Sequence, residues 1–294
     1  VKSLHAGVTD PDTTRLLLRE SRVMGRLEHP NIVPVHGLAW DDAHGPRLVM
    51  KRIEGTSWRA QLGGRKGLDR LEHHLGILAT VAQALHFAHS RGVIHRDVKP
   101  ANVMVGEFGE VYLVDWGVAR LADDPPDPED ALLGSPAYAA PEMVVGGTVD
   151  ARTDVFLLGS TLHFILTGEA RHRGPGLEDV LRAAARAEPH RFGPDVPDEL
   201  AQLCNRACAH DPSERPPTAL AFRDALQDYL RHRASIAVAR EATGVLQRTD
   251  DDAPDRLLTL RNLATARFGF EQALREWPAN PEARHGLQQC LRRT

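Results

Sequence analysis

The sequence predicts an α+β fold with a small, incomplete β-sheet, a larger lobe made mainly of helices, and a helical tail. Short β-branched segments broken by Pro and Gly are concentrated in the first half of the chain, and apolar residues recur at helical spacing through most of the rest. At 294 residues the chain is long enough for one large domain in two lobes or for two domains. We therefore expect three parts, at residues 1–52, 53–232 and 233–294.

The first part reads as one helix followed by two strands. The apolar residues of TTRLLLRESRVMGRL, residues 13–27, fall on one face of a helix. HPNIVPVHGLAW, residues 29–40, and RLVMKRI, residues 47–53, are β-branched runs broken by Pro and Gly, which predicts two strands. Helical periodicity resumes at residues 71–92, where we expect Gly92 to end the helix.

The middle of the chain alternates short strands with polar loops. The apolar ends of VIHRDVKPANVMV, residues 93–105, predict two strands that hold a polar loop between them, and VYLVDW, residues 111–116, predicts a third. LADDPPDPED, residues 121–130, has no periodicity and no residue for a core, so we expect an exposed loop there. Helices are expected at 152–167, 177–187, 198–209 and 217–233, and again in the tail on both sides of a turn or linker at 249–255.

Composition narrows the choice of partners and location. The formal net charge of -4 gives no reason to expect a nucleic acid or a membrane surface as partner. The start, VKSLHAGVTD, lacks the pattern of a signal peptide. The most apolar segment, residues 155–168, is too short to cross a bilayer and contains His163, so it reads as a buried core helix. We therefore expect a cytoplasmic protein with no membrane segment.

The three cysteines, Cys204, Cys208 and Cys290, are too few for a disulfide framework and favour a reducing compartment. Cys204 and Cys208 are four residues apart on an expected helix, so they either present two thiolates to a metal or are two small buried thiols. We favour the buried thiols, because a metal site needs two further well-placed ligands.

Polar residues in the middle of the segment 93–105 suggest a specific chemistry. Asp97, Lys99 and Asn102 offer a base, a cation and an amide oxygen on one short loop, and Asp115 follows at the end of the next apolar strand. A loop held between two strands positions its side chains rigidly. Such a set suits phosphoryl transfer, in which one group orients the attacking hydroxyl, a lysine neutralises phosphate charge and two oxygen ligands hold Mg²⁺.

In these motifs the sequence resembles the eukaryotic-type (Hanks-type) protein kinases, and particularly the bacterial serine/threonine kinases. HRDVKPAN, residues 95–102, looks like their catalytic loop, and DWG, residues 115–117, is similar to their DFG with Trp in place of Phe. SPAYAAPE, residues 135–142, resembles the segment that ends in their APE motif. The resemblance covers roughly residues 1–232 and implies a two-lobed kinase-like fold, with a partial small lobe in residues 1–52 and the large lobe in residues 53–232.

The resemblance also implies the roles of individual residues. Asp97 would orient the substrate hydroxyl and accept its proton, and Lys99 would contact the transferring phosphate, which favours Ser or Thr substrates over Tyr. Asn102 and Asp115 would hold Mg²⁺ or Mn²⁺. The residues expected to bind ATP are Lys2, Glu20, Met50, Arg52 and Asp115.

Two of these residues depend most on the resemblance. Lys2 matches the lysine that binds the α and β phosphates of ATP, and Glu20 matches the glutamate on the small-lobe helix. Without the resemblance, Lys2 would be a solvated charge and Glu20 an exposed helix carboxylate.

Six further residues would be structural or regulatory by resemblance: His95, Arg96, Ser135, Glu142, Asp154 and Arg215. His95 would pack under the metal-binding loop, and Asp154 would cap the backbone N–H groups around His95 and Arg96. Ser135 would bridge Asp97 and Lys99, and Glu142 and Arg215 would form a buried ion pair. A stack of core side chains would be made by Met24, Val35, His95 and Trp116.

The sequence departs from the kinase pattern in two places. Kinases cover the ATP phosphates with a glycine-rich loop ahead of the lysine, and the sequence begins at Val1. Either the sequence is an N-terminally truncated fragment of a longer kinase or the protein lacks this cover, and in both cases we expect weak ATP binding and impaired transfer. Residues 118–134 contain no Ser, Thr or Tyr for Arg96 to bind once phosphorylated. Either the acids of this loop replace a phosphate or the loop has no partner; the acids are Asp123, Asp124, Asp127, Glu129 and Asp130.

The tail supports a weaker prediction. Residues 266–287 resemble part of a tetratricopeptide repeat, with Ala273, Pro278 and Ala283 at fitting positions. About three such units are needed for independent stability, so either more repeats follow or the tail docks on the kinase.

The function we expect is a serine/threonine protein kinase that uses ATP and Mg²⁺ on protein substrates. The alternative is a pseudokinase or scaffold that binds partner proteins through the large lobe and the tail.

Overall fold

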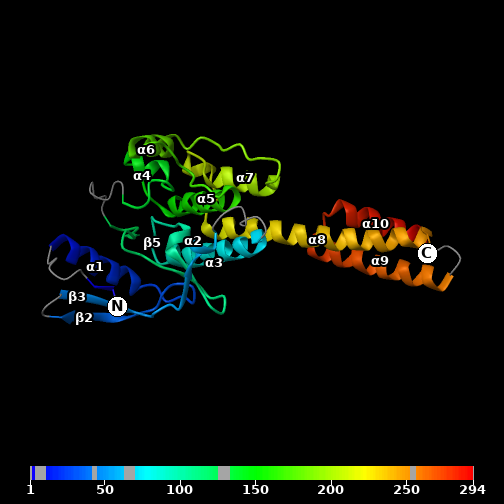
Figure 1. Ribbon diagram of the computed structural model, residues 1–294, viewed down its shortest axis with the longest axis horizontal. Helices are drawn as coiled ribbons and strands as arrows, with labels where there is room; N and C mark the ends of the chain where they lie inside the picture. Colours follow the sequence, from blue (N-terminus) through cyan, green and yellow to red (C-terminus); the bar gives the residue numbers. More distant parts are fainter. Residues whose placement is uncertain are drawn as a thin grey trace. The chain divides into compact units, whose positions relative to one another are not determined.

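The structure, a computed structural model of the chain, describes residues 2–3, 11–41, 45–62, 70–124, 133–251 and 256–293. The chain divides into two compact units, Val1–Ala225 and Leu226–Thr294. In the described residues, all strands belong to the first unit, and the second unit is helical (Figure 1).

The first unit begins with a three-stranded antiparallel sheet that one helix covers. Strands β1 (Lys2–Ser3), β2 (Val35–Asp41) and β3 (Gly45–Met50) pair in the order β1-β3-β2. Helix α1 (Pro11–Met24) packs against β2 and β3, and its apolar face buries Leu17 and Val23 (Figure 1). The predicted helix and the two predicted strands are therefore confirmed, although the helix ends at Met24 and a connecting loop follows it.

The elements that hold the polar loop of residues 95–102 come next. In chain order they are β4 (Gly55–Ser57), α2 (Trp58–Gln61), α3 (Leu71–Ser90), β5 (Val93–Ile94), a 3-10 turn (Pro100–Asn102), β6 (Val103–Gly106), β7 (Val111–Leu113) and β8 (Arg120–Leu121). Strand β6 pairs with β4 and β7, and β5 pairs with β8. Gly92 follows α3 with φ 71, a left-handed conformation in which glycine ends a helix without strain.

The rest of the first unit is helical. It contains α4 (Pro141–Val145), α5 (Ala151–Thr167), α6 (Leu177–Arg186), α7 (Asp198–Ala207), a 3-10 turn (Pro212–Glu214) and the start of α8 (Ala219–Asp251). Helix α5 begins with a capping box between Asp150 and Thr153, and it is buried on all sides along residues 153–166. The predicted core helix around His163 is therefore confirmed. None of the helices in the described ranges has the length and apolar character that crossing a membrane requires.

Cys204 and Cys208 lie on and just after α7 where it packs against α5. Both are buried, and the thiol of Cys204 donates to the carbonyl of Gly159 at 3.4 Å. A Cβ on Gly159 would lie 2.8 Å from the Cys208 sulfur, so only glycine permits this close approach. The two side chains are each only 1% exposed, which is the burial expected of two small thiols.

Two predictions about element boundaries are wrong. Leu121 is not part of an exposed loop: it is 5% exposed and pairs with Val93 in the two-stranded sheet β5-β8, a strand too short to show periodicity in the sequence. The helix expected to end at residue 233 continues to Asp251, because the segment contains no proline and only one glycine, Gly244. Residues 125–130 and 252–255 lie outside the described residues.

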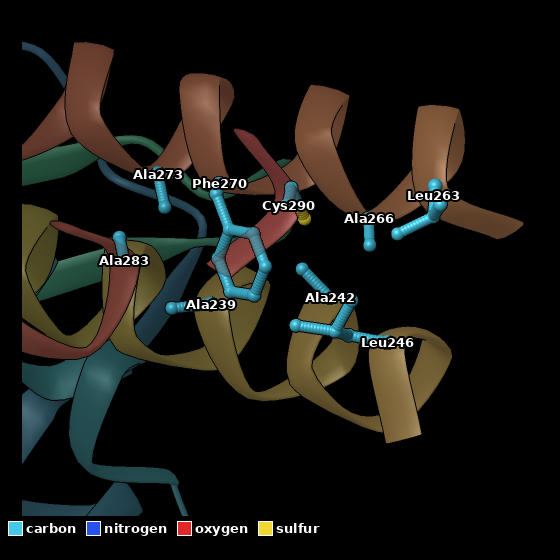
Figure 2. Close-up of a cluster of buried hydrophobic side chains, with 9 residues drawn as sticks. All are labelled: Ala239, Ala242, Leu246, Leu263, Ala266, Phe270, Ala273, Ala283 and Cys290. Atoms are coloured by element: carbon cyan, nitrogen blue, oxygen red, sulfur yellow. The ribbon is translucent and has the colours of Figure 1, made fainter. Parts of the chain in front are cut away.

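The second unit contains the rest of α8, α9 (Arg256–Glu276) and α10 (Pro281–Arg293). Figure 2 shows that side chains from all three helices meet in one apolar cluster around Phe270. Gly286 faces this ring so closely that a Cβ there would lie 2.2 Å from it. The cluster also includes Ala273 and Ala283, two of the positions that fit a tetratricopeptide repeat.

Candidate active site

The loop of residues 95–102 lies between β5 and β6 and carries Asp97 at its centre. Asp97 is only 7% exposed, and its Oδ2 accepts hydrogen bonds from Lys99 Nζ at 2.6 Å and from Asn102 Nδ2 at 2.8 Å. Asn102 Nδ2 also lies 2.8 Å from the Asp97 carbonyl oxygen. These bonds fix the carboxylate through one oxygen, which leaves Oδ1 as the oxygen available for a substrate hydroxyl.

Lys99 links this loop to the segment that precedes α4. Its Nζ lies 2.5 Å from Ser135 Oγ as well as 2.6 Å from Asp97 Oδ2. Ser135 therefore shares Lys99 with Asp97, as the resemblance implies. The neighbouring Gly134 has φ 114, and a Cβ there would lie 2.9 Å from the carbonyl oxygen of Arg96. Only glycine lets this segment approach the loop so closely.

Asn102 and Asp115 form a pair of oxygen donors. Val114 N–H donates to the Asn102 carbonyl at 3.0 Å, so the residue next to Asp115 is bound directly to Asn102. Asp115 has φ 63 and is exposed just beyond β7. Because Asn102 uses its amide nitrogen for Asp97, its amide oxygen remains for a cation. An amide oxygen and a carboxylate are the hard ligands that Mg²⁺ prefers, so these residues fit the metal.

Asp154 supports the loop from α5. Its carboxylate accepts the backbone N–H groups of His95 and Arg96, each at 2.8 Å. His89 Nε2, at the end of α3, lies 2.7 Å from the same carboxylate. Burial by itself raises the pKa of Asp154, but the hydrogen bond and charge of His89 outweigh it, so that the pKa lies below its ordinary value. The aspartate therefore stays ionised and holds Arg96, which has the strained φ of 70, in place.

His89 is the part of this arrangement that sequence reasoning missed. Its partner is 65 positions further along the chain, and no local pattern marks such a pair. Its place in the last turn of α3 is the one signal in the sequence, because cationic side chains are favoured at the C-terminal end of a helix.

The rings of His95 and Trp116 pack against each other beneath the site at an interplanar angle of 54°. Their ring centroids are 4.5 Å apart and both residues are fully buried. Burial lowers the pKa of His95, and the neutral ring accepts the Asp97 N–H at Nδ1 over 3.2 Å. Met24 and Val35, the other two residues of the expected stack, line one cavity of about 530 Å³ at the end of α1.

The residues expected to bind ATP differ in how far the structure describes them and in how deeply they are buried. Lys2 lies in β1 opposite Leu48, but its side chain is outside the described part of the structure. Glu20 is 3% exposed, so it is not the exposed helix carboxylate that its position alone suggests. Met50 is half-buried at the end of β3, and Arg52 is exposed just after it.

Glu142 and Arg215 form the expected ion pair. Arg215 donates to both carboxylate oxygens, at 2.7 and 2.9 Å, and Thr153 Oγ1 donates to Glu142 Oε1 at 2.8 Å. The Arg215 side chain is fully buried and that of Glu142 is 8% exposed. The pair holds α4 against the residues that follow α7.

The acids of residues 118–134 can be followed only in part. Asp124 accepts the backbone N–H of Leu121 at 3.2 Å, so it stabilises its own turn. Asp123 is exposed. Asp127, Glu129 and Asp130 lie outside the described residues.

Comparison with known proteins points to one family. The family model described as "Protein kinase domain" matches residues 1–229. The serine/threonine-protein kinase PknK of Mycobacterium tuberculosis is 36% identical over 227 residues, which are 76% of this chain and 20% of the relative. PknB of Mycolicibacterium smegmatis is 35% identical over 233 residues (76% and 37%), and PknD of Mycobacterium tuberculosis is 35% identical over 244 residues (80% and 36%). The chain thus spans between a fifth and two fifths of the length of these relatives.

Proposed function

The chain belongs to the protein kinase domain family, and on that premise we propose that it is a serine/threonine protein kinase. The reaction would transfer the γ-phosphate of ATP to Ser or Thr hydroxyls of protein substrates. The observation that carries the proposal is the orientation of Asp97 by Lys99 and Asn102, both of which bind its Oδ2. The names of the three relatives, all serine/threonine-protein kinases, support the choice of Ser and Thr.

The side chains divide the work of transfer. Asp97 Oδ1 would accept a hydrogen bond from the substrate hydroxyl and so direct a lone pair of the hydroxyl oxygen toward the phosphorus. The same carboxylate oxygen would then receive the proton of the hydroxyl. Lys99, already bound to Asp97 and Ser135, would place its cation against the transferring phosphate. Asn102 and Asp115 would hold Mg²⁺, which supplies neutralisation of phosphate charge. Lys2, Glu20, Met50 and Arg52 would bind the rest of ATP.

We also infer a cytoplasmic location and a protein partner for the second unit. The three cysteines are all buried and are too few for a disulfide framework, which suits a reducing compartment.

The direct test is phosphoryl transfer from radiolabelled ATP and Mg²⁺ to myelin basic protein, followed by phosphoamino-acid analysis. The parent chain should label Ser and Thr but not Tyr, and Asp97→Asn should lower the rate by about 10²-fold to 10⁴-fold, the range for loss of a general base. The matched control is Asp195→Asn, an exposed aspartate of the same unit, which should leave the rate unchanged. An Asp97→Asn variant as active as the parent would contradict the proposal.

A further inference from the structure

The second unit has a helix with two apolar faces. The inner face of α9 supplies Leu263, Ala266, Phe270 and Ala273 to the core cluster shown in Figure 2. This face is also fixed by polar contacts, because Ser235 Oγ donates to the Ala273 carbonyl at 2.7 Å and Asn280 Nδ2 donates to Ser235 Oγ at 2.8 Å. The inner face of α9 is therefore packed in the core of the second unit.

The outer face of α9 carries a second apolar stripe. Leu257 is 78% exposed, Leu260 is 50% exposed and Phe268 is 60% exposed, and the exposed Ala264 lies between them. Their spacing of three or four residues places them on one line along the helix, opposite Ala266 and Phe270. Single exposed apolar residues are common, but a line of them over three helical turns indicates a surface that binds something.

The charges around this stripe are mainly positive. Arg261, Arg267 and Arg275 are exposed on the same side of α9, and the Arg275 guanidinium lies 5.7 Å from the centre of the Phe268 ring. The acid on this side, Glu271, forms an ion pair with Arg267 at 2.8 Å. The stripe and its border therefore match a ligand that is both apolar and acidic.

We propose that the outer face of α9 binds an acidic amphipathic helix of a partner protein. The apolar residues of that helix would pack along Leu257, Leu260 and Phe268, and its Asp and Glu side chains would pair with the arginines. A helix fits better than a strand, because side chains one turn apart on α9 interlock with side chains one turn apart on a second helix. The stripe from Leu257 to Phe268 spans about 16 Å, which is three turns of such a helix.

An anionic membrane has the same charge, but the geometry of α9 favours the helical partner. A helix that lies in a membrane surface buries one wide apolar face in lipid. On α9 the larger apolar face is already buried in the core of the unit, and the outer stripe is a single row. The inference goes beyond the kinase proposal and depends only on the second unit.

The test measures binding to the full chain without nucleotide, so its result does not depend on kinase activity. The probe is a fluorescein-labelled synthetic helical peptide with Leu at alternating spacings of three and four and Glu at the flanking positions; its control has Lys in place of each Glu. We expect the acidic peptide to raise the fluorescence anisotropy, to bind more weakly as salt rises, and to bind at least tenfold more tightly than the basic peptide.

Variants locate the surface. Phe268→Asn, Leu260→Asn and the charge reversal Arg261→Glu should each weaken binding of the acidic peptide at least tenfold. Leu291→Asn is the matched control, because Leu291 is 54% exposed but lies on α10, and it should bind as the parent does. Circular dichroism should show unchanged helicity in all four variants, since the side chains are exposed.

Four outcomes would overturn the proposal. The first three are no binding of the acidic peptide, equal binding of the acidic and basic peptides, and parent-like binding by Phe268→Asn. A fourth is tighter binding of phosphatidylserine-containing vesicles than of the peptide, with the same dependence on Phe268, which would assign the surface to a membrane.

Discussion

Asp154 is the residue through which the core of the first unit holds the loop of residues 95–102. It is fully buried, it binds two consecutive backbone N–H groups, and it is kept ionised by His89. A single buried charge can do this because its bonds to the two N–H groups and to His89 are only 2.7 to 2.8 Å long and the carboxylate itself is fully buried. The carboxylate of Asp97 is oriented separately, by its hydrogen bonds from Lys99 and Asn102.

The buried pair of Glu142 and Arg215 gives a prediction about stability. Arg215→Ala leaves Glu142 as a buried charge without its cation, so the free energy of unfolding should fall by about 3 to 5 kcal/mol. Urea unfolding at pH 7 measures the change. The control is Arg182→Ala, which removes an exposed pair with Glu178 and should change the free energy by less than about 1 kcal/mol. If the two variants lost the same free energy of unfolding, burial of the Glu142–Arg215 pair would not be the reason for its contribution to stability.

His163 gives a prediction about pH. Burial lowers the pKa of His163 to about 3, and Arg171 and His190 beside it add to the effect; burial also lowers the pKa of His172 to about 4. An unfolded histidine has a pKa of about 6.5, so below that pH the unfolded chain binds protons that the folded protein does not. Stability should therefore be complete above about pH 6.5 and should fall as the pH decreases toward 4, by on the order of 1 kcal/mol per pH unit for each histidine.

Urea unfolding at a series of pH values between 7.5 and 5 measures this slope. His163→Gln keeps a donor for the carbonyl of Glu169 and should make the slope shallower. His36→Gln, which changes an exposed histidine, should leave the slope as in the parent. A His163→Gln variant with the parent's slope would show that another group causes the acid sensitivity.

At the scale of elements, the site depends on how closely the segment before α4 approaches the catalytic loop. Gly134→Ala adds a Cβ 2.9 Å from the Arg96 carbonyl at a residue with φ 114, so we expect a loss of more than about 1 kcal/mol of stability. The shift of the loop next to Asp97 should also lower kcat by about tenfold or more, because small displacements at a reacting centre are costly.

Gly76→Ala is the matched control for Gly134→Ala. Gly76 lies within α3, and a Cβ there would meet no atom within 4 Å. This variant should gain about 0.5 to 1 kcal/mol of stability and keep the parent's kcat. Thermal unfolding and the transfer assay test both variants; a normal kcat for Gly134→Ala would mean that the segment moves without disturbing Asp97.

At the scale of the whole molecule, the two units have separate cores. Phe270→Ala removes the central side chain of the second unit and should cost about 3 to 5 kcal/mol there, whereas Phe268→Ala, at an exposed position two residues away, should cost less than about 0.5 kcal/mol. Hydrogen exchange should show faster opening of α9 and α10 in Phe270→Ala. The transfer rate should be unchanged, because the residues proposed for catalysis belong to the first unit; a loss of transfer would show that the units are coupled.

The sequence was informative where a motif is local. Asp97, Lys99 and Asn102 are within six residues of one another, so their order alone indicates the loop that the structure shows. Helix α5 and the first strands were also predictable, because their apolar periodicity is long or strongly β-branched. The burial of Leu121 was not, since a two-residue strand shows no periodicity, and the end of α8 was placed too early although the segment contains no proline to end the helix.

Local motifs and periodicity were enough to identify the family, the helical and β-rich regions, and the polar residues that we propose for the chemistry. Only the tertiary structure decided that His89 binds Asp154, that Gly134 touches the Arg96 carbonyl, and that α9 has a core face and a separate outer stripe. These contacts differ from the motifs in the separation of the partners along the chain. Local spacing fixes which side chains share a loop or a helix face, whereas pairing across tens of residues depends on how the whole chain packs.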